Sequence, residues 1–174
     1  MILVLGVFFG IIAALRQNKF VDRLLMFLST LGATIPSFVF ATGFLFLFSK
    51  ILNVVPSYGV NSWKGYIGPV LVSALFSLAY VVRLTRTSTL DVLNQDYIRT
   101  ARAKGLPEWK VLGKHALRNA LLPVVTYIGP MFAALITGSF VVEKVFGIPG
   151  IGNLSYIIHG FAVKVAESHI VTTF

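Results

Sequence analysis

DVLNQDYIRTARAKGLPEWKVLGKHALRNALLP (residues 91–123) is the only long polar segment in an otherwise apolar sequence. Apolar runs lie on both sides of it, so we expect it to be a loop that joins two membrane-spanning helices. This segment therefore predicts how the chain is organised, with helices anchored in the membrane and one ordered polar loop between two of them.

The loop is predicted to contain two helices and a corner. Residues 96–104 predict a short helix, with Asp96 as its N-cap residue. Gly105 falls where a helix usually ends, and Pro107 prevents easy continuation of that helix. A second helix is expected from Glu108 towards Leu122, where the chain re-enters the membrane.

These residues resemble the transmembrane (permease) subunits of bacterial ABC importers, in the peptide and nickel branch. That family carries a cytoplasmic motif of Glu-Ala-Ala, three further residues and Gly, with a later Leu-Pro. Gly105 takes the place of the motif's Gly, and Arg99, Thr100 and Ala101 take the Glu-Ala-Ala places without its acidic residue. The Leu-Pro at 122–123 lies further from Gly105 than in the sugar permeases. The segments YIRTARAKGLP and HALRNALLP nevertheless resemble the form that this motif takes in the peptide branch.

The resemblance extends outward to AALRQNKFVD and ITGSFVVEKVFGIPGIG and covers roughly residues 10 to 157. It implies an all-α polytopic helical bundle of the type I importer kind. It also implies that the loop forms a coupling helix in a groove of a separate ATPase subunit. The residues expected to make this ATPase contact are Tyr97, Arg99, Thr100, Ala101, Ala103, Gly105, Leu106 and Pro107.

The family resemblance also implies partners and a location. A second permease subunit, ATP-binding cassette ATPase subunits and an external solute-binding protein are the expected partners, in the inner membrane of a bacterial cell. Peptides or related solutes are the expected cargo, with nickel as the alternative. The external binding protein would set the specificity, so the sequence of this chain does not name the substrate.

Composition independently predicts a membrane protein. Hydrophobic residues make up 56% of the chain, and its mean hydropathy is +0.84, far above that of a soluble domain. Since about 20 apolar residues span a bilayer core, the expected spans are about 1–15 (partial), 24–49, 65–85 and 119–142. We expect a single permease domain over 1–174, with residues 86–118 as the cytoplasmic coupling loop.

The net charge of +9 is distributed as in a membrane protein. Lys and Arg cluster at 16–23 and 83–118, whereas only Lys50 and Lys64 lie in the gap between. The positive-inside rule places the two clusters in the cytoplasm and 50–64 outside. Several of these side chains are expected to contact anionic membrane lipid. Binding to nucleic acid is not expected, because it needs a basic face with aromatic platforms on a soluble fold.

Prolines predict interruptions in two of the spans. Pro36 removes a backbone donor from the 24–49 run, and Gly129-Pro130 is expected to kink or break the 119–142 run. Because unsatisfied backbone is costly in lipid, Pro36, Gly129 and Pro130 are expected to line the helix bundle or a watery pathway. Gly32 and Gly43 are expected to allow close approach of helices.

The two ends depart from the family pattern. The first apolar run is short, and residues 161–174, FAVKVAESHIVTTF, are interrupted by charges where the family has its last helix. We therefore expect a chain truncated at both ends, or the product of a broken reading frame. A non-transporting membrane remnant is the corresponding alternative function.

Catalysis has no support in the sequence. There are no cysteines, and His115, His159 and His169 are too scattered for a metal triad. No Walker motif is present, so ATP is expected to be hydrolysed by another subunit, and no cofactor is expected. A secondary transporter or channel is disfavoured, because no charge lies within the four uncharged runs 1–15, 24–49, 65–82 and 120–142.

Overall fold

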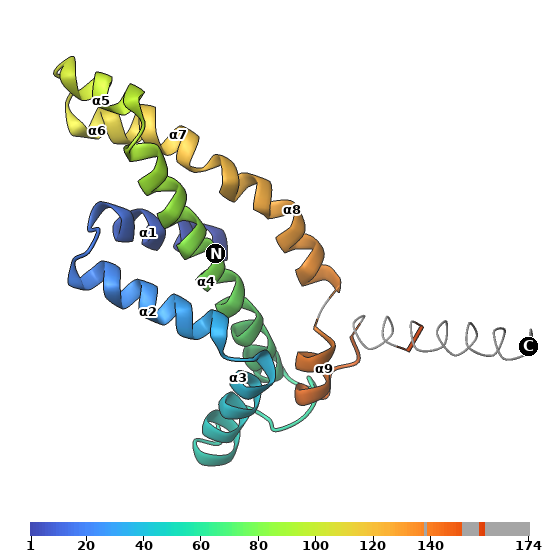
Figure 1. Ribbon diagram of the computed structural model, residues 1–174. Coiled ribbons are helices and arrows are strands. Elements are labelled where there is room, and N and C mark those ends of the chain that lie inside the picture. The colour runs from blue at the N-terminus through green and yellow to red at the C-terminus, as the bar shows by residue number, and fades with distance from the viewer. Residues whose placement is uncertain (138, 151–156, 159–174) are drawn as a thin grey trace, which may run out of the picture. The chain divides into compact units, whose positions relative to one another are not determined.

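The computed structural model describes residues 1–137, 139–150 and 157–158 (Figure 1). Within these ranges all regular structure is helical and no strand occurs, which confirms the predicted all-α fold. The chain divides into two compact units. Unit 1 comprises Met1–Ile35 and Ala74–Met131, and unit 2 comprises Pro36–Ser73 with the described residues from Phe132 onward. The expectations for His159, His169 and residues 161–174 lie outside the described residues.

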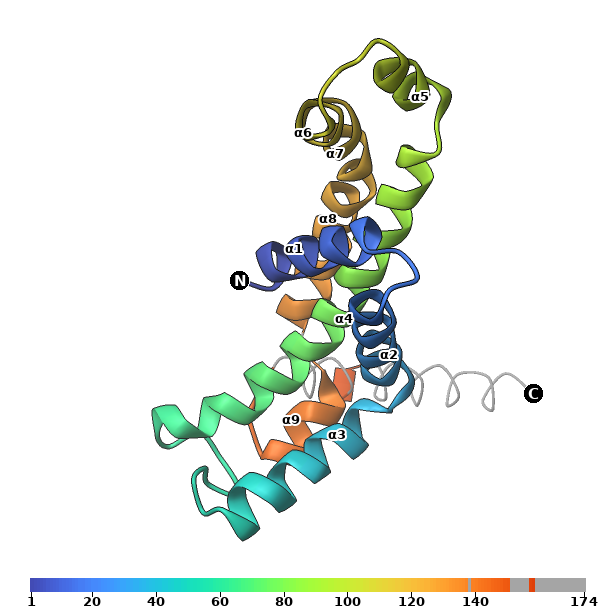
Figure 2. The same cartoon turned by 90° about the vertical axis from the view of Figure 1, so that its left-hand side faces the viewer.

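Unit 1 holds two helices joined by a tight corner, the greater part of a long helix and the helices of the polar loop. These are α1 (Ile2–Leu15), α2 (Phe20–Thr34), α4 (Ile67–Leu93, from Ala74 onward), α5 (Asp96–Ala103), α6 (Glu108–Lys110), the π-helix η3 (Val111–Ala116), α7 (Leu117–Ala120) and the first part of α8 (Leu122–Thr137). Figures 1 and 2 show α5, α6 and α7 together beyond the C-terminal end of α4. One core cluster joins Val81 of α4 to Val124 and Met131 of α8.

Unit 2 is held together by aromatic contacts. It contains α3 (Ser37–Phe44), the π-helix η1 (Leu45–Ile51), the short 3-10 helix η2 (Trp63–Tyr66), the start of α4 and α9 (Phe140–Phe146). The ring centroids of Phe44 and Phe146 lie 6.2 Å apart. The Phe146 carbonyl also accepts a hydrogen bond of 2.9 Å from the backbone N–H of Gly59. These contacts fasten α9 to α3 and to the segment before η2.

The helix break predicted at Pro36 is present. α2 ends at Thr34, and both Ile35 (ψ 125°) and Pro36 (ψ 142°) are extended before α3 begins at Ser37. At Gly129-Pro130, where a kink or a break was predicted, a break is wrong, because α8 continues as one helix through both residues. Proline removes one backbone hydrogen bond, and a membrane helix tolerates that loss without ending.

The predicted small-residue contacts are only partly present. A methyl group on Gly32 would lie 3.1 Å from the Cβ of Ala79, so α2 and α4 do approach closely there. Around Gly43 and Gly129 the described residues leave open space. These two glycines therefore do not serve contacts within the described part of the chain.

Several helices have the length and composition of membrane spans. Among the described residues, Trp63–Leu93 and Glu108–Phe146, the latter across the undescribed residue 138, are long and apolar enough to cross a bilayer. The pair Phe20–Thr34 and Ser37–Ile51 supplies a third span if its two parts are counted as one. α4 continues to Leu93, beyond residue 85 where that span was expected to end. The sidedness of the spans stays a prediction.

Candidate functional site

α5 has one buried face and one exposed face. Ile98 and Ala101 are buried, whereas Tyr97, Arg99 and Ala103 are exposed. The N-cap lies one residue earlier than the sequence suggested, and the helix covers Asp96–Ala103. Its N-cap is the extended residue Gln95, whose carbonyl accepts hydrogen bonds from the N–H groups of Ile98 and Arg99. The prediction of Asp96 as N-cap is therefore wrong, and Asp96 lies in the first turn, where a negative charge favours the helix dipole.

A small apolar core fixes the buried face of α5. Ile98 and Ala101 pack with Val111 and Ala116 of η3, and Val92, Leu93 and Leu106 cover the cluster. Val111 and Ala116 are five residues apart, a spacing that brings two side chains to the same face in a π-helix with its i→i+5 bonding. The π geometry therefore allows both residues to face α5, and the loop has a core of its own.

The corner after α5 is a Schellman motif. Gly105 has φ +75°, a left-handed conformation that favours glycine. Its N–H donates to the Arg102 carbonyl (2.9 Å), and the Leu106 N–H donates to the Ala101 carbonyl (3.4 Å), which is the bonding pattern of this motif. Leu106 also packs against the cluster that contains Ala101. The predicted end of the helix at Gly105 is confirmed, and the glycine there is left-handed.

Two polar contacts fasten the loop to the long helices. The Asn119 amide donates to the Tyr97 hydroxyl (2.9 Å), which ties α5 to α7. The Ser88 hydroxyl donates to the Ala120 carbonyl (2.6 Å), which ties α4 to the end of α7. α7, which leads into α8, is therefore tied both to α5 and to α4.

The exposed face of α5 carries charges that are only weakly engaged within the chain. Arg102 pairs with Glu108 at 2.8 Å, and Arg99 pairs with Asp96 at 3.6 Å. All four side chains are strongly exposed, and ion pairs of this kind contribute little to stability. These groups are available to an external partner.

The structure sorts the predicted coupling residues into two roles. Tyr97, Arg99, Thr100, Ala103, Gly105 and Pro107 are exposed, whereas Ala101 is buried and Leu106 half-buried in the loop core. Pro36, Gly129 and Pro130 are not part of this site. Pro36 opens unit 2, and Gly129-Pro130 lies in α8 near the end of unit 1.

An exposed tryptophan next to the corner was not predicted as part of the site. Trp109 is 70% exposed, with the Lys110 ammonium 5.2 Å from its ring centroid. These two residues line an open hollow together with Leu106, Gly113, Lys114 and His115. The sequence signal for this feature was an aromatic residue two positions after a helix-ending Gly-Leu-Pro corner.

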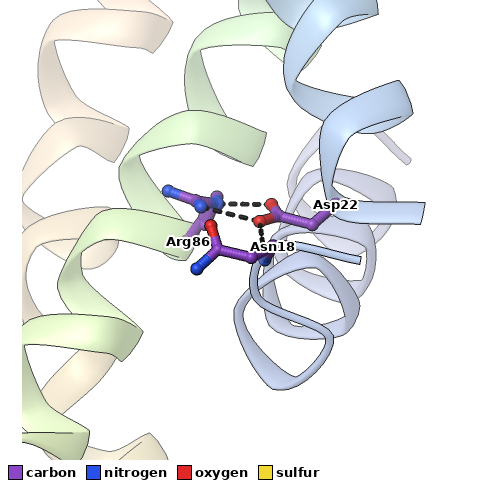
Figure 3. Close-up of polar contacts among 3 residues, drawn as sticks. All are labelled: Asn18, Asp22 and Arg86. Atoms are coloured by element: carbon purple, nitrogen blue, oxygen red, sulfur yellow. Dashed lines mark hydrogen bonds and ion pairs between the residues drawn. The ribbon is translucent and has the colours of Figure 1, made fainter. Parts of the chain in front are cut away.

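Sequence reasoning also missed an ion pair between α2 and α4. The Arg86 guanidinium donates from Nε to Asp22 Oδ1 (2.5 Å) and from Nη2 to Asp22 Oδ2 (2.8 Å) (Figure 3). The Asp22 side chain is 3% exposed. The sequence placed Arg86 only within the basic cluster at 83–118. The hydrophobic periodicity within each segment gives no information about a contact between two residues that are 64 positions apart in the sequence.

Comparison with known proteins identifies the family. The chain matches the model of the family described as "Binding-protein-dependent transport system inner membrane component" over residues 6–159. The dipeptide transport system permease protein DppB of Bacillus subtilis (strain 168) is 47% identical over 148 residues, which cover 85% of this chain and 48% of that protein. The oligopeptide transport system permease protein OppB of Escherichia coli (strain K12) is 46% identical over 153 residues, covering 87% and 50%.

A third relative carries a different substrate name. The glutathione transport system permease protein GsiC of Shigella flexneri serotype 5b (strain 8401) is 46% identical over 151 residues, covering 87% of this chain and 49% of that protein. The chain spans about half the length of these curated relatives. The match nevertheless covers most of the chain, including the loop, α4 and α8. The predicted resemblance is confirmed: the chain belongs to the family of binding-protein-dependent transport system inner membrane components.

Proposed function

We propose that this chain acts as the permease component of an ATP-driven peptide importer and that α5 with its Gly105–Pro107 corner docks on a separate ATPase subunit. Three relatives are named for the transport of dipeptides, oligopeptides and glutathione, all of which contain peptide bonds. A bacterial inner membrane, a second permease subunit and an external solute-binding protein complete the proposed assembly. ATP hydrolysis is assigned to the ATPase subunit.

The arrangement of α5 carries this proposal. A docking helix must present an exposed face to its partner, and it must be held firmly from behind. Arg99, Thr100 and Ala103 are exposed, while Ile98 and Ala101 anchor the opposite face in the loop core. A flexible polar loop would deform when a partner displaced it, whereas a packed helix transmits the displacement to the residues it contacts.

The contacts of the loop connect α5 to the long helices, so a displacement of α5 can reach them. A displacement of α5 acts on α7 through Tyr97 and Asn119 and on η3 through the apolar cluster. α7 continues into α8, and Ser88 links the same end of α7 to α4. In the proposed mechanism, closure of the ATPase subunits moves α5, and the two long helices follow to open one side of the pathway and shut the other.

Site-directed crosslinking tests the docking surface. A photoreactive residue placed at Thr100 or Ala103 is expected to crosslink to a co-expressed ATPase subunit. The matched control is the same residue at Gln17, which is also exposed and lies in the other predicted cytoplasmic segment. Crosslinks from Gln17 with none from Thr100 or Ala103 would overturn the proposal.

Cysteine labelling tests the proposed sidedness. The chain contains no cysteine, so single cysteines at Ser57 and Asn94 are unique labelling sites. We expect a membrane-impermeant maleimide to label Ser57→Cys from outside the cell and Asn94→Cys only after the membrane is opened. Labelling of both positions from the same side contradicts the assignment.

A further inference from the structure

The corner between α1 and α2 is a closed, hydrogen-bonded turn. Asn18 adopts a left-handed conformation with φ 63°. Its backbone N–H donates to Oδ2 of Asp22 in the first turn of α2 (2.8 Å). The carboxylate of Asp22 therefore fixes the corner and at the same time points at α4 (Figure 3).

Arg86 of α4 meets this carboxylate with two parallel hydrogen bonds. A guanidinium that engages both carboxylate oxygens sets the orientation of the two side chains as well as their distance. The Asp22 side chain is almost fully buried and that of Arg86 is 21% exposed, so water competes little for these bonds. The pair is directional, and a small sliding movement between the helices would break it.

The rest of the α1–α2 pair also lies against α4, but through apolar contacts. A methyl group on Gly10 would lie 2.5 Å from Thr85 Cβ, and one on Gly6 would lie 2.6 Å from Val81 Cγ1. These glycines are four residues apart, and they let α1 cross α4 at close range. Smooth apolar contacts of packed helices permit small shear movements. The Asp22–Arg86 pair adds a polar, directional contact at the corner.

Arg86 lies two residues before Ser88, which holds the end of α7. The same turn of α4 is thus tied on one side to the α1–α2 corner and on the other to the helices that carry the loop. The uncharged runs 1–15, 24–49, 65–82 and 120–142 contain neither residue, and the pair lies just outside two of them.

We propose that Asp22 and Arg86 are positioning residues that form a latch, through which a displacement of α5 is carried to α1 and α2 as well as to α8. The transport aspect of this inference rests on the proposed function, whereas the mechanical link is a property of unit 1 alone. With the latch closed, α1, α2, the second half of α4 and α5 move as one body. With the latch removed, the α1–α2 pair shifts along α4 independently of the loop.

Spin labels measure this link without any partner. Gln17 in the corner and Thr100 on α5 are both exposed, and the cysteine-free chain allows labels at these two positions alone. In lipid nanodiscs we expect a single narrow distance distribution between the labels by double electron–electron resonance. In the double variant Asp22→Asn/Arg86→Gln we expect the width to increase at least twofold.

The double variant is chosen because it leaves no lone buried charge, and it is therefore expected to fold. Arg102→Gln, which removes an exposed pair within the loop, is the matched control and should keep the narrow distribution. A narrow distribution in a folded double variant would show that the pair only adds stability, and it would overturn the latch.

A second readout separates the latch from the proposed docking function. In membranes that hold the chain with its permease partner, ATPase and binding protein, we expect the double variant to keep the Thr100 crosslink and ATP hydrolysis. Uptake of a labelled dipeptide per ATP hydrolysed should fall at least tenfold. An unchanged ratio overturns the latch. Loss of the crosslink in the parent protein instead refutes the proposed docking, while the nanodisc distances still decide the latch.

Discussion

The polar loop and the α1–α2 corner hold their shapes by opposite means. In the loop, Ile98 and Val111 are fully buried, while the ion pairs lie in solvent. In the corner, the reverse holds, because the Asp22–Arg86 pair is shielded and the turn residues 15–19 are exposed. The loop thus uses apolar packing for its geometry and leaves its charges to a partner, whereas the corner uses a charge pair to fix geometry.

This difference determines what each region tolerates. An exposed charge can be exchanged at little cost, because water replaces the lost partner. A buried charge that loses its partner has no such replacement. We therefore expect the replacement of an arginine to lower the free energy of unfolding much more in the corner than in the loop.

Removal of Arg86 is expected to have the largest effect. Arg86→Gln leaves the buried Asp22 carboxylate without its partner, and breaking such a pair costs about 3–5 kcal/mol. The free energy of unfolding in detergent micelles, measured by titration with a denaturant, checks this value. Arg99→Gln is the matched control and should change the free energy by less than about 0.5 kcal/mol. Equal effects of the two substitutions would abolish the distinction between corner and loop.

Truncation of the loop core is expected to come next. Ile98→Ala removes a fully buried side chain, which costs about 2–4 kcal/mol in a packed core. Because the cluster lies within the loop, the loss should be seen as faster amide hydrogen exchange over residues 96–103. Ile136→Ala, at a position that is 68% exposed, is the control. Unchanged exchange in Ile98→Ala would mean that the loop does not depend on apolar packing.

The backbone conformation at Gly105 is expected to contribute less. Gly105→Ala places a Cβ at φ +75°, and the left-handed conformation costs about 1–2 kcal/mol for residues other than glycine. Gly113→Ala is the contrasting variant, since its added methyl meets open space within η3. It should be neutral or stabilising. Hydrogen exchange of the loop measures the change in stability for both variants. If both variants changed the stability in the same direction, Gly105 would have no special role.

The exposed pair of Arg102 and Glu108 is expected to have the smallest effect. Arg102→Gln should cost less than about 1 kcal/mol, because both groups are hydrated and screened by salt. The loop should therefore keep its exchange protection in 0.5 M salt as well as in dilute buffer. A large salt dependence would show that charge, and not apolar packing, orders the loop.

The loop was predictable from sequence because its signals are local. Residues that lie next to one another in the chain predict the helix from residue 96, its end near Gly105 and the second helix from Glu108, and all three are present. The N-cap was misplaced by one residue because both Gln95 and Asp96 can occupy such a boundary. Pro36 was likewise predictable, since its ring acts on the preceding turn.

The contacts that position the loop were not predictable in this way. Asp22 and Arg86 are far apart in sequence, and neither lies in a motif that points to the other. The Tyr97–Asn119 bond depends on the path of the chain through the corner. At Pro130 the rule that proline ends a helix did not hold, because the surrounding apolar residues continue the helix despite the missing N–H donor.

The π-helical segment η3 gives the loop a place that absorbs changes in chain length. A π-turn holds one residue more than the α-turn it replaces, and single π-turns occur as bulges within α-helices. Deletion of Gly113, which is exposed and faces open space, is therefore expected to turn η3 into ordinary α-helix. Val111 and Ala116 would then be four positions apart, a spacing that again places both side chains on the same face of the helix. The entry of the chain into α8 would keep its orientation, so one residue gained or lost here need not rotate the membrane helix that follows.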